Sequence, residues 1–446
     1  MSKTIKIISQ LIDTETGEIE LESTLLQEKL KAPKSMKTLG YNHKTQIKLL
    51  QEAQDFKLLN QEKLINNDDI CPKCGKKNRK QGKFTSPFHS IFTDHKLEIQ
   101  RRTCSCGWRT PYTVEGLFGS ALHPDLLERQ SLLGAEHSYQ VAEKILAHES
   151  TVHRAINNDD RIKRTVSLVG ETFCELKMEL DWGKSDKAKT RLIVNVDGGH
   201  VLSKRDAKHS FEAMIGTVHA PEAIKRIDKH HTKLVCKTSV ASAYDDKQLT
   251  MKKLLKNACL QQGMTLKTEI EALTDGAKNC WNIVHSLEGN CKTLIKILDW
   301  FHIGKKFKER ESTIPAEHKL LFTKIKWHLW HGHVKTALIR LAQLELVLKD
   351  NVDTLEKLKS LKTYITNNSE QIVNYHSRRL RKKSYTSNIA ETSVNSLINA
   401  RQKRNQKMQW TREGAHNVLQ LRTSLFSDGW SKDWDKAQDR LYKNAA

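Results

Sequence analysis

The sequence has no long hydrophobic run. No stretch approaches the roughly 18 consecutive apolar residues of a membrane-spanning helix, and residues 1–20 lack the apolar core and cleavage site of a secretory signal. The chain also contains no internal repeat and no low-complexity tract. We therefore expect a water-soluble globular protein that stays in the cytoplasm and has no membrane partner.

Acidic residues are few relative to basic ones. Lys and Arg number 75, whereas Asp and Glu number 52, so the formal net charge at pH 7 is +23. This excess of positive charge favours a polyanionic partner, with nucleic acid as the leading candidate, and hence association with the nucleoid. In a reducing cytoplasm the nine cysteines are expected to be thiols or metal ligands rather than disulfides.

From residue 191 onward the apolar pattern is typical of strands. A chain of 446 residues exceeds the usual size of a single core, so more than one domain is expected. Early strands followed by alternating helices and strands predict a mixed α/β sheet, and a long helical stretch follows it. The predicted strands are 191–196, 211–218, 232–242, 269–274 and 293–298, with a helix at 248–262 and the long helical stretch at about 311–384.

Two close pairs of cysteines lie in a loop-rich segment. The first pair occurs in CPKCGKKN and the second in RRTCSCGW, with 29 residues between them: Cys71, Cys74, Cys104 and Cys106. Four thiolates at these spacings suit a tetrahedral zinc ion, and the glycine after each pair permits a tight turn. The spacing predicts a structural zinc ribbon, in which His89 or His95 could replace a ligand. The alternative is four unligated thiols.

The segment SYQVAEKILAHESTVHRAINN predicts two short helices joined by a turn. Apolar residues mark one face of the first helix up to a break near His148, and Ser150 or Thr151 is placed to cap the second. This spacing fits a helix-turn-helix whose second helix presents His153 and Arg154 to a DNA groove. Two ordinary packed helices would produce nearly the same pattern.

Two of the predicted strands end in the same dipeptide, Asp-Gly. Asp197 follows RLIVNV and Asp275 follows EIEALT, and the glycine after each lets a phosphate or a metal ion approach closely. If the strands are neighbours, the two carboxylates can share divalent cations, as phosphoryl transfer with two metal ions requires. The alternative is that each aspartate only caps the following turn or helix.

Longer stretches make the likeness to one family specific. LDWFHIGKKF, KWHLWHGHVKTALIRL and NIAETSVNSLINARQKRNQKMQWTREGAHNVLQLRT, with the order of Asp197, Asp275 and a distant glutamate, resemble the DDE transposases of bacterial insertion sequences. The resemblance is to the Kra-type group, distant relatives of Mutator-like transposases, and covers most of the chain from the cysteines onward. It implies an RNase H-like fold in which Glu391 is the third metal-binding carboxylate, carried on a helix.

The same resemblance implies the chemistry and the partners. Asp197, Asp275 and Glu391 would hold two Mg²⁺ (or Mn²⁺) ions, which activate a water or a DNA 3′-hydroxyl and stabilise the leaving oxygen. Asp299 and His302 resemble the Asp-x-x-His element of Mutator-like relatives and are expected beside the site, although a histidine that merely fixes the loop is equally compatible. The expected partners are double-stranded DNA, as terminal inverted repeats and target, and at least one more copy of the chain.

The surroundings of Glu391 agree with a metal ligand. It lies between SRRLRKKSYTSN and NARQKRNQK, in the most basic part of the chain, where a carboxylate opposes polyanion binding unless a cation neutralises it. Its rival is Glu413 in TREGAH, and a solvated or salt-bridged glutamate is the alternative. Because 116 residues separate Asp275 from Glu391, a helical insertion is expected between them.

Basic residues and one tryptophan around Glu391 are candidate DNA contacts. The cations would neutralise phosphates and the tryptophan would stack on an unpaired base, whereas a solvated charged face and a core tryptophan are the alternatives. The candidates are Arg378, Arg379, Arg381, Arg401, Lys403, Arg404 and Trp410.

These features predict a multidomain α/β protein with six parts. They are an N-terminal helical region (1–66), a zinc ribbon (67–112), a helix-turn-helix module (113–165), the first part of an RNase H-like catalytic core (166–310), a helical insertion (311–384) and the last catalytic helix with a basic C-terminal region (385–446).

Two other functions stay open at the level of sequence. A transposon-derived DNA-binding regulator would use the zinc ribbon and the helix-turn-helix without chemistry, although the three carboxylates argue against it. A nuclease of the same fold would cut DNA without joining it.

Overall fold

The chain divides into two compact units in the computed structural model, which describes residues 3–67, 69–179, 182, 185, 187–204, 209–228, 232–387, 393–403 and 408–442. The first unit comprises Met1–Leu168 and Trp434–Ala446, and the second comprises Val169–Asp433. No helix among the described residues is both long enough and apolar enough to cross a membrane.

The first unit begins with an antiparallel hairpin and a long helix. Strands β1 (Lys3–Ile12) and β2 (Ile19–Leu30) pair with each other, and helix α1 (His43–Asn67) follows. The helix that we predicted throughout 1–66 is therefore wrong for β1 and β2. In KTIKIISQLI the side chains alternate between half-buried and exposed, and β-branched isoleucines at this period of two favour a strand.

The middle of the first unit is a second hairpin that packs on α1. Strands β3 (Arg79–His89) and β4 (Asp94–Thr103) are antiparallel, and helix α2 (Val114–Phe118) lies close by. Their buried core is small and consists of Leu97, Ile99 and Val114. The further helices are α3 (Pro124–Glu136), α4 (Tyr139–Glu149), α5 (Arg154–Asn157), α6 (Asp159–Met178) and α17 (Trp430–Leu441), of which α6 and α17 cross the boundary between the units.

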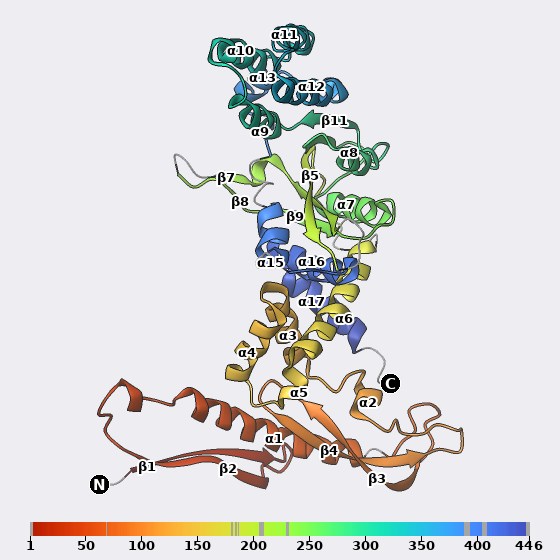
Figure 1. The fold of residues 1–446 in the computed structure, drawn as a ribbon. Helices are drawn as coiled ribbons and strands as arrows, with labels where there is room; N and C mark the ends of the chain where they lie inside the picture. The colour runs from red at the N-terminus through yellow and green to blue at the C-terminus, as the bar shows by residue number, and fades with distance from the viewer. Residues whose placement is uncertain are drawn as a thin grey trace. The chain divides into compact units, whose positions relative to one another are not determined.

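The second unit is built around a mixed five-stranded sheet (Figure 1), which confirms the predicted mixed α/β architecture. The strands lie in the order β11-β10-β5-β6-β9; β11, β10 and β5 are parallel, and β6 runs antiparallel to its two neighbours. Their bounds are β5 (Arg191–Leu202), β6 (Ser210–His219), β9 (Thr238–Ser242), β10 (Glu269–Thr274) and β11 (Thr293–Leu298). The predicted strand 232–242 is two strands, because β8 (Thr232–Leu234) pairs with β7 (Ile224–Arg226) outside the sheet.

Each face of the sheet carries its own core, because successive side chains of a strand point to opposite faces. Leu192, Val194 and Val196 pack with α7 (Leu249–Gln261) and α8 (Lys278–His285) on one face. Ile193 belongs to the other core, which is built from the next five helices of the chain. These are α9 (Trp300–Glu311), α10 (Lys319–Trp330), α11 (Val334–Val347), α12 (Val352–Asn367) and α13 (Tyr375–Leu380), drawn together in Figure 1.

The last helical segments of the second unit pack against the sheet. Residues 393–402 form a continuous helix that includes a π-helical segment, η5 (Asn395–Asn399), and ends in α15 (Ala400–Gln402). Helix α16 (Arg412–Phe426) packs beside β9. Short 3₁₀ turns occur at η1 (Met36–Thr38), η2 (Pro221–Ala223), η3 (Ala316–His318) and η4 (Ser369–Gln371).

Candidate functional site

Three aspartates lie side by side where the parallel strands end. The last residues of β5, β10 and β11 that pair in the parallel ladders are aligned across the sheet: Val196, Thr274 and Leu298. The next residue of each strand is an aspartate: Asp197, Asp275 and Asp299. Because adjacent strands are about 4.8 Å apart, this register places the three residues side by side, and we call them the aspartate cluster. Asp197 lies four residues after Ile193 in β5, so the two residues are on the same face of the sheet. This is the face that α9 to α13 cover.

Strand β5 continues beyond Asp197, contrary to our prediction that it stops there. Pairing with β6 extends to Leu202, whereas pairing with the parallel neighbour β10 ends at the residue before Asp197. Asp197 therefore marks the end of the ladder on one side only. The sequence of β5 alone did not reveal this continuation, because the partner strand on the other side, β6, is a separate segment of the chain.

The two glycines after Asp197 serve close packing. A Cβ atom at Gly199 would lie 2.6 Å from Cδ1 of Ile398, and one at Gly198 would overlap the side chain of Glu212. Neither glycine needs a positive φ angle. Gly199 thus lets the helix at 393–402 approach β5, and this corrects our interpretation that the glycines make room for a phosphate or a metal ion.

The carboxylates of Asp197 and Asp275 face mutual repulsion. Burial raises the pKa of Asp197, and the nearby charges of Asp275 and Asp299 raise it further. Asp197 Oδ1 accepts a hydrogen bond from the Gly198 N–H at 2.8 Å, and Asp275 Oδ1 accepts one from the Ala277 N–H at 2.9 Å. Each aspartate therefore makes a local hydrogen bond to the backbone, but neither caps a helix. A divalent cation would relieve the remaining repulsion, and hard carboxylate oxygens are the ligands that Mg²⁺ prefers.

Asp299 anchors a distant segment of the chain. Its fully buried carboxylate caps α9 by accepting a hydrogen bond from the Phe301 N–H at 3.0 Å. It also accepts hydrogen bonds from Ser387, from the backbone N–H at 3.0 Å and from the hydroxyl. His302 lies one turn further along α9, with Nε2 3.7 Å from Asp299 Oδ2. Asp299 and His302 thus lie beside the Asp197–Asp275 pair, and Asp299 has a clear structural role there.

Glu391 lies outside the described residues, but its described neighbours on both sides are held by the sheet. Ser387 is bound to Asp299 at the end of β11. Ser393 is buried and accepts a hydrogen bond from the Thr217 hydroxyl of β6 at 3.3 Å.

Two tyrosines that the sequence analysis missed support the aspartate cluster from the helices. The Tyr364 hydroxyl of α12 donates to the backbone oxygen of Asp275 at 2.8 Å, and the Tyr375 hydroxyl of α13 donates to that of Leu298 at 2.8 Å. Burial raises the pKa of both tyrosines, which keeps them protonated as donors. In the sequence they are indistinguishable from ordinary core aromatics of a helix.

The four cysteines of the predicted zinc ribbon come together. Their sulfur atoms all lie within 4.8 Å of one another, and the pairs at 3.7 and 3.4 Å are Cys71–Cys106 and Cys74–Cys104. A tetrahedral zinc with Zn–S bonds of about 2.3 Å separates its sulfurs by about 3.8 Å, so this set fits the ion. Gly75 and Gly107 have φ angles of +69° and +88°, as the predicted turns require.

The histidines between the cysteine pairs have other partners. His89 Nδ1 lies 2.5 Å from Asp94 Oδ1, and His95 Nδ1 lies 2.5 Å from Asp55 Oδ1. Within the described part of the chain, the four cysteines are the only group of three or more His, Cys, Asp or Glu side chains gathered this closely around one point. The thiols share their protons: a hydrogen bond with the Cys106 backbone lowers the pKa of Cys104 to about 6, whereas hydrogen bonds with the other cysteines raise the pKa of Cys74 to about 12.

The predicted helix-turn-helix is present only in part. Ser138 is the first residue of the predicted segment. Helix α4 begins directly after it, and the Ser138 hydroxyl caps the helix. The second helix, α5, has only four residues and is capped by His153, not by Ser150 or Thr151. A single turn is too short to follow a DNA groove, and its exposed Arg154 is paired with Glu143 of α4 at 2.7 Å. The predicted cap at Ser150 or Thr151 is therefore wrong, and the geometry of α5 does not support the predicted placement of His153 and Arg154 in a DNA groove.

The predicted DNA contacts fall into two groups. Arg379, Arg381 and Lys403 are exposed, and Arg404 lies outside the described residues. Arg401 and Trp410 are buried, and the Arg378 side chain is only 12% exposed and paired with Glu271, which corrects the prediction of these three as surface contacts. The Arg401 guanidinium stacks on the Trp410 ring at 4.8 Å, and Trp410 Nε1 donates to the backbone oxygen of Gln402 at 3.2 Å.

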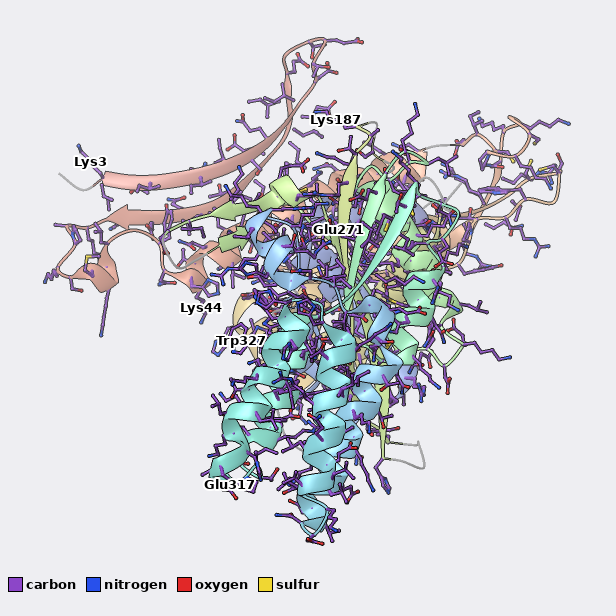
Figure 2. All side chains as sticks on the ribbon, turned by 90° about the horizontal axis from the view of Figure 1, so that it is seen from above. Lys3, Lys44, Lys187, Glu271, Glu317 and Trp327 are labelled. Atoms are coloured by element: carbon purple, nitrogen blue, oxygen red, sulfur yellow. The ribbon has the colours of Figure 1, made fainter. Side chains whose placement is uncertain are left out.

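Arg378 is paired with Glu271 inside the second unit. Its Nη2 lies 2.7 Å from Glu271 Oε2, and the Glu271 side chain has no exposed surface. Figure 2 shows Glu271 within the sheet. Both charges are therefore separated from water and depend on each other.

Arg378→Met is expected to lower the free energy of unfolding by about 3–5 kcal/mol, because it leaves a buried carboxylate without its cation. Chemical denaturation of the two proteins measures this. The matched control is Arg379→Met at the adjacent exposed position, which should change stability by less than about 0.5 kcal/mol. If Arg378→Met were as stable as the native chain and bound DNA more weakly, Arg378 would be a DNA contact after all.

Comparison of the chain with protein-family models and with curated proteins gives no match. The function must therefore be inferred from the site itself.

Proposed function

We propose that the protein is a DDE-type DNA transposase that cleaves DNA at the ends of its element and joins those ends to target DNA, with Asp197, Asp275 and Glu391 as the metal-binding carboxylates. The observation that carries this proposal is the alignment of Asp197 and Asp275 on neighbouring parallel strands. Two carboxylates in register at a strand end are suited to sharing divalent cations.

The strand order supports the RNase H-like fold that the family resemblance implies. Counted along the chain, the sheet strands lie in the order 5-4-1-2-3, and the second is antiparallel to its neighbours. This is the order expected of an RNase H-like core. The long helical segment between β11 and residue 393 then corresponds to the expected insertion before the last catalytic helix.

The residues present fit Mg²⁺. Asp197 and Asp275 offer hard oxygen ligands, and the pKa of Asp197 is raised chiefly by burial and further by the charges of Asp275 and Asp299, which a cation would neutralise. Bound Mg²⁺ would supply activation of a water or a 3′-hydroxyl and stabilisation of the leaving oxygen. The chain itself positions the carboxylates: the Tyr364 hydroxyl fixes the backbone at Asp275, and Asp299 fixes Ser387 on the approach to Glu391.

The substrate proposal rests on charge. The chain has a formal net charge of +23, and Arg379, Arg381 and Lys403 expose cations on segments that flank the site in sequence. The first unit, with its cysteine cluster and α3 to α5, is the candidate for recognition of the terminal repeats.

The full-length protein is expected to bind its element's terminal repeats more tightly than random DNA of equal length. Affinity for both should fall steeply as salt rises, because phosphate contacts release counterions. Fluorescence anisotropy at several salt concentrations measures both effects. Equal affinity for the two DNAs at every salt concentration would refute sequence recognition and leave only an electrostatic attraction.

The test of the function is incubation of the purified protein with DNA that contains both element ends, a target plasmid and Mg²⁺, followed by sequencing of the products. A transposase yields joined products with element ends at new positions. Cleavage without joining would identify a nuclease. Specific binding with neither reaction would identify a DNA-binding regulator.

A further inference from the structure

A groove of about 850 Å³ runs beside α9 and α10 in the second unit. One wall is aromatic. Trp330 is only 6% exposed and packs against Trp300 with ring centroids 4.8 Å apart, which makes a rigid base. Trp327 stands at 89° to Trp330 and is 51% exposed. A large aromatic ring that is fixed by a buried neighbour and open to solvent is a ready platform for stacking.

Basic side chains lie along the groove, between further aromatic residues. Its basic lining residues are Lys305, Lys308, Lys326 and Arg379. Among the described residues that line the groove, Glu311 is the one acidic residue. Lys305, Lys308 and Arg379 are exposed, whereas Lys326 is half-buried with Nζ 5.9 Å from the Trp300 ring centroid. Cations combined with an open aromatic face match a ligand that has both phosphates and planar rings.

The groove adjoins the aspartate cluster. Trp300 is the first residue of α9, directly after Asp299, and its N–H donates to the backbone oxygen of Tyr385 at 3.2 Å. Thr386 lines the groove, and the next residue, Ser387, is bound to Asp299. In Figure 2, Trp327 lies at the end of the helical group nearer to the sheet, whereas Glu317 lies at its far end.

Gly304 keeps the floor of the groove open. A Cβ atom there would meet only Lys326 Nζ, at 4.0 Å. The glycine lies inside helix α9, where it costs stability relative to alanine by up to about 1 kcal/mol. A larger side chain at this position would enter the groove without displacing the backbone, and this offers a way to block it.

We propose that this groove binds unpaired nucleotides of a DNA strand next to the scissile phosphodiester, with one base stacked on Trp327 and the phosphates held by Lys305, Lys308 and Arg379. Paired bases offer no free face to a tryptophan, and a cavity of this volume accommodates a small-molecule-sized ligand, not a duplex. The position relative to a scissile bond rests on the proposed function; the binding of single-stranded DNA does not.

The test measures binding of a fluorescein-labelled 12-nucleotide oligothymidylate to the full-length protein in buffer without added Mg²⁺, which leaves protein-bound zinc in place, beside a blunt duplex. Trp327→Ala and Gly304→Leu should each weaken oligothymidylate binding about tenfold, because base stacking contributes roughly 1–3 kcal/mol per base. Duplex binding should change less than about twofold. Trp327→Phe, which keeps a ring, should retain part of the affinity.

The matched control is Leu320→Ala on the same helix, at a position that is 67% exposed and does not line the groove. It should bind oligothymidylate as the native protein does. Thermal melts check that Trp327→Ala and Gly304→Leu fold. Unchanged oligothymidylate affinity in both folded variants would overturn the groove proposal.

The outcome is separable from that of the proposed function, since omitting Mg²⁺ prevents the Mg²⁺-dependent reaction during the binding measurement. DNA cleavage by the native protein together with unchanged oligothymidylate binding in the variants would refute the groove alone. Weakened binding in the variants, with no cleavage by the native protein in Mg²⁺, would refute the transposase and leave the groove as a single-strand binding site.

Discussion

Asp197→Asn, Asp275→Asn and Glu391→Gln are each expected to reduce Mg²⁺-dependent strand cleavage by several orders of magnitude. Each substitution removes a charge while keeping the side-chain shape, and metal ligands act as a unit, so that the loss of one disables the whole site. Removing a charge lowers the repulsion between Asp197 and its neighbours, so the variants should stay folded. DNA binding should therefore persist. Gel analysis of nicked and joined products, alongside thermal melts, measures the effect.

Glu413→Gln is the control for the third carboxylate. Glu413 lies in the first turn of α16, which Thr411 caps, so its charge complements the positive end of the helix. We expect this variant to cleave at a near-native rate. Native cleavage by Glu391→Gln together with an inactive Glu413→Gln would reassign the third ligand. Activity in both aspartate variants would remove the catalytic interpretation altogether.

Cys104→Ser is expected to eliminate bound zinc and to unfold the segment from 67 to 112. Elemental analysis of the native protein should find about one zinc per chain, held by Cys71, Cys74, Cys104 and Cys106. The buried apolar core of this segment consists of Leu97, Ile99 and Val114, which is too small to hold it folded alone. Structural zinc typically contributes roughly 10–16 kcal/mol of apparent binding energy to such a module.

Hydrogen exchange distinguishes local from global unfolding. In Cys104→Ser the amides of β3 and β4 should lose protection, whereas those of β5 and β10 should keep it. Cys236→Ser is the matched control, because Cys236 is an exposed thiol outside the cluster. Absence of zinc from protein purified under reducing conditions, or full protection of β3 and β4 in the variant, would contradict the zinc ribbon.

Short-range patterns in the sequence were sufficient for several features. The cysteine pairs predict a cluster because two ligands two or three residues apart must lie close together, with a glycine to turn the chain. Strands β10 and β11 match their predicted bounds, since an apolar run that stops at a polar residue is a local signal. The mixed character of the sheet followed from the order of these runs.

The N-terminal hairpin was missed for a different reason. The alternating pattern in KTIKIISQLI is visible in the sequence, but its exposed face is polar and its half-buried face is only weakly apolar, so helix propensity dominated the prediction. The second predicted helix, after α4, was expected to begin after Ser150 or Thr151, but α5 begins after His153. Its apolar spacing continues across Asn158, where the backbone becomes extended and α6 begins.

By itself, the sequence determined where β10 and β11 end, which cysteines form pairs and where positive charge accumulates. Only the tertiary structure decided that Asp275 is a neighbour of Asp197, that Asp299 binds Ser387 and that Gly199 serves helix packing. It also decided that Arg401 is buried and Arg378 is only 12% exposed, while Arg379 is exposed. The physical reason is the same throughout: a side chain's partners come from segments tens to hundreds of residues away, and the energy of a charge depends on whether those partners separate it from water.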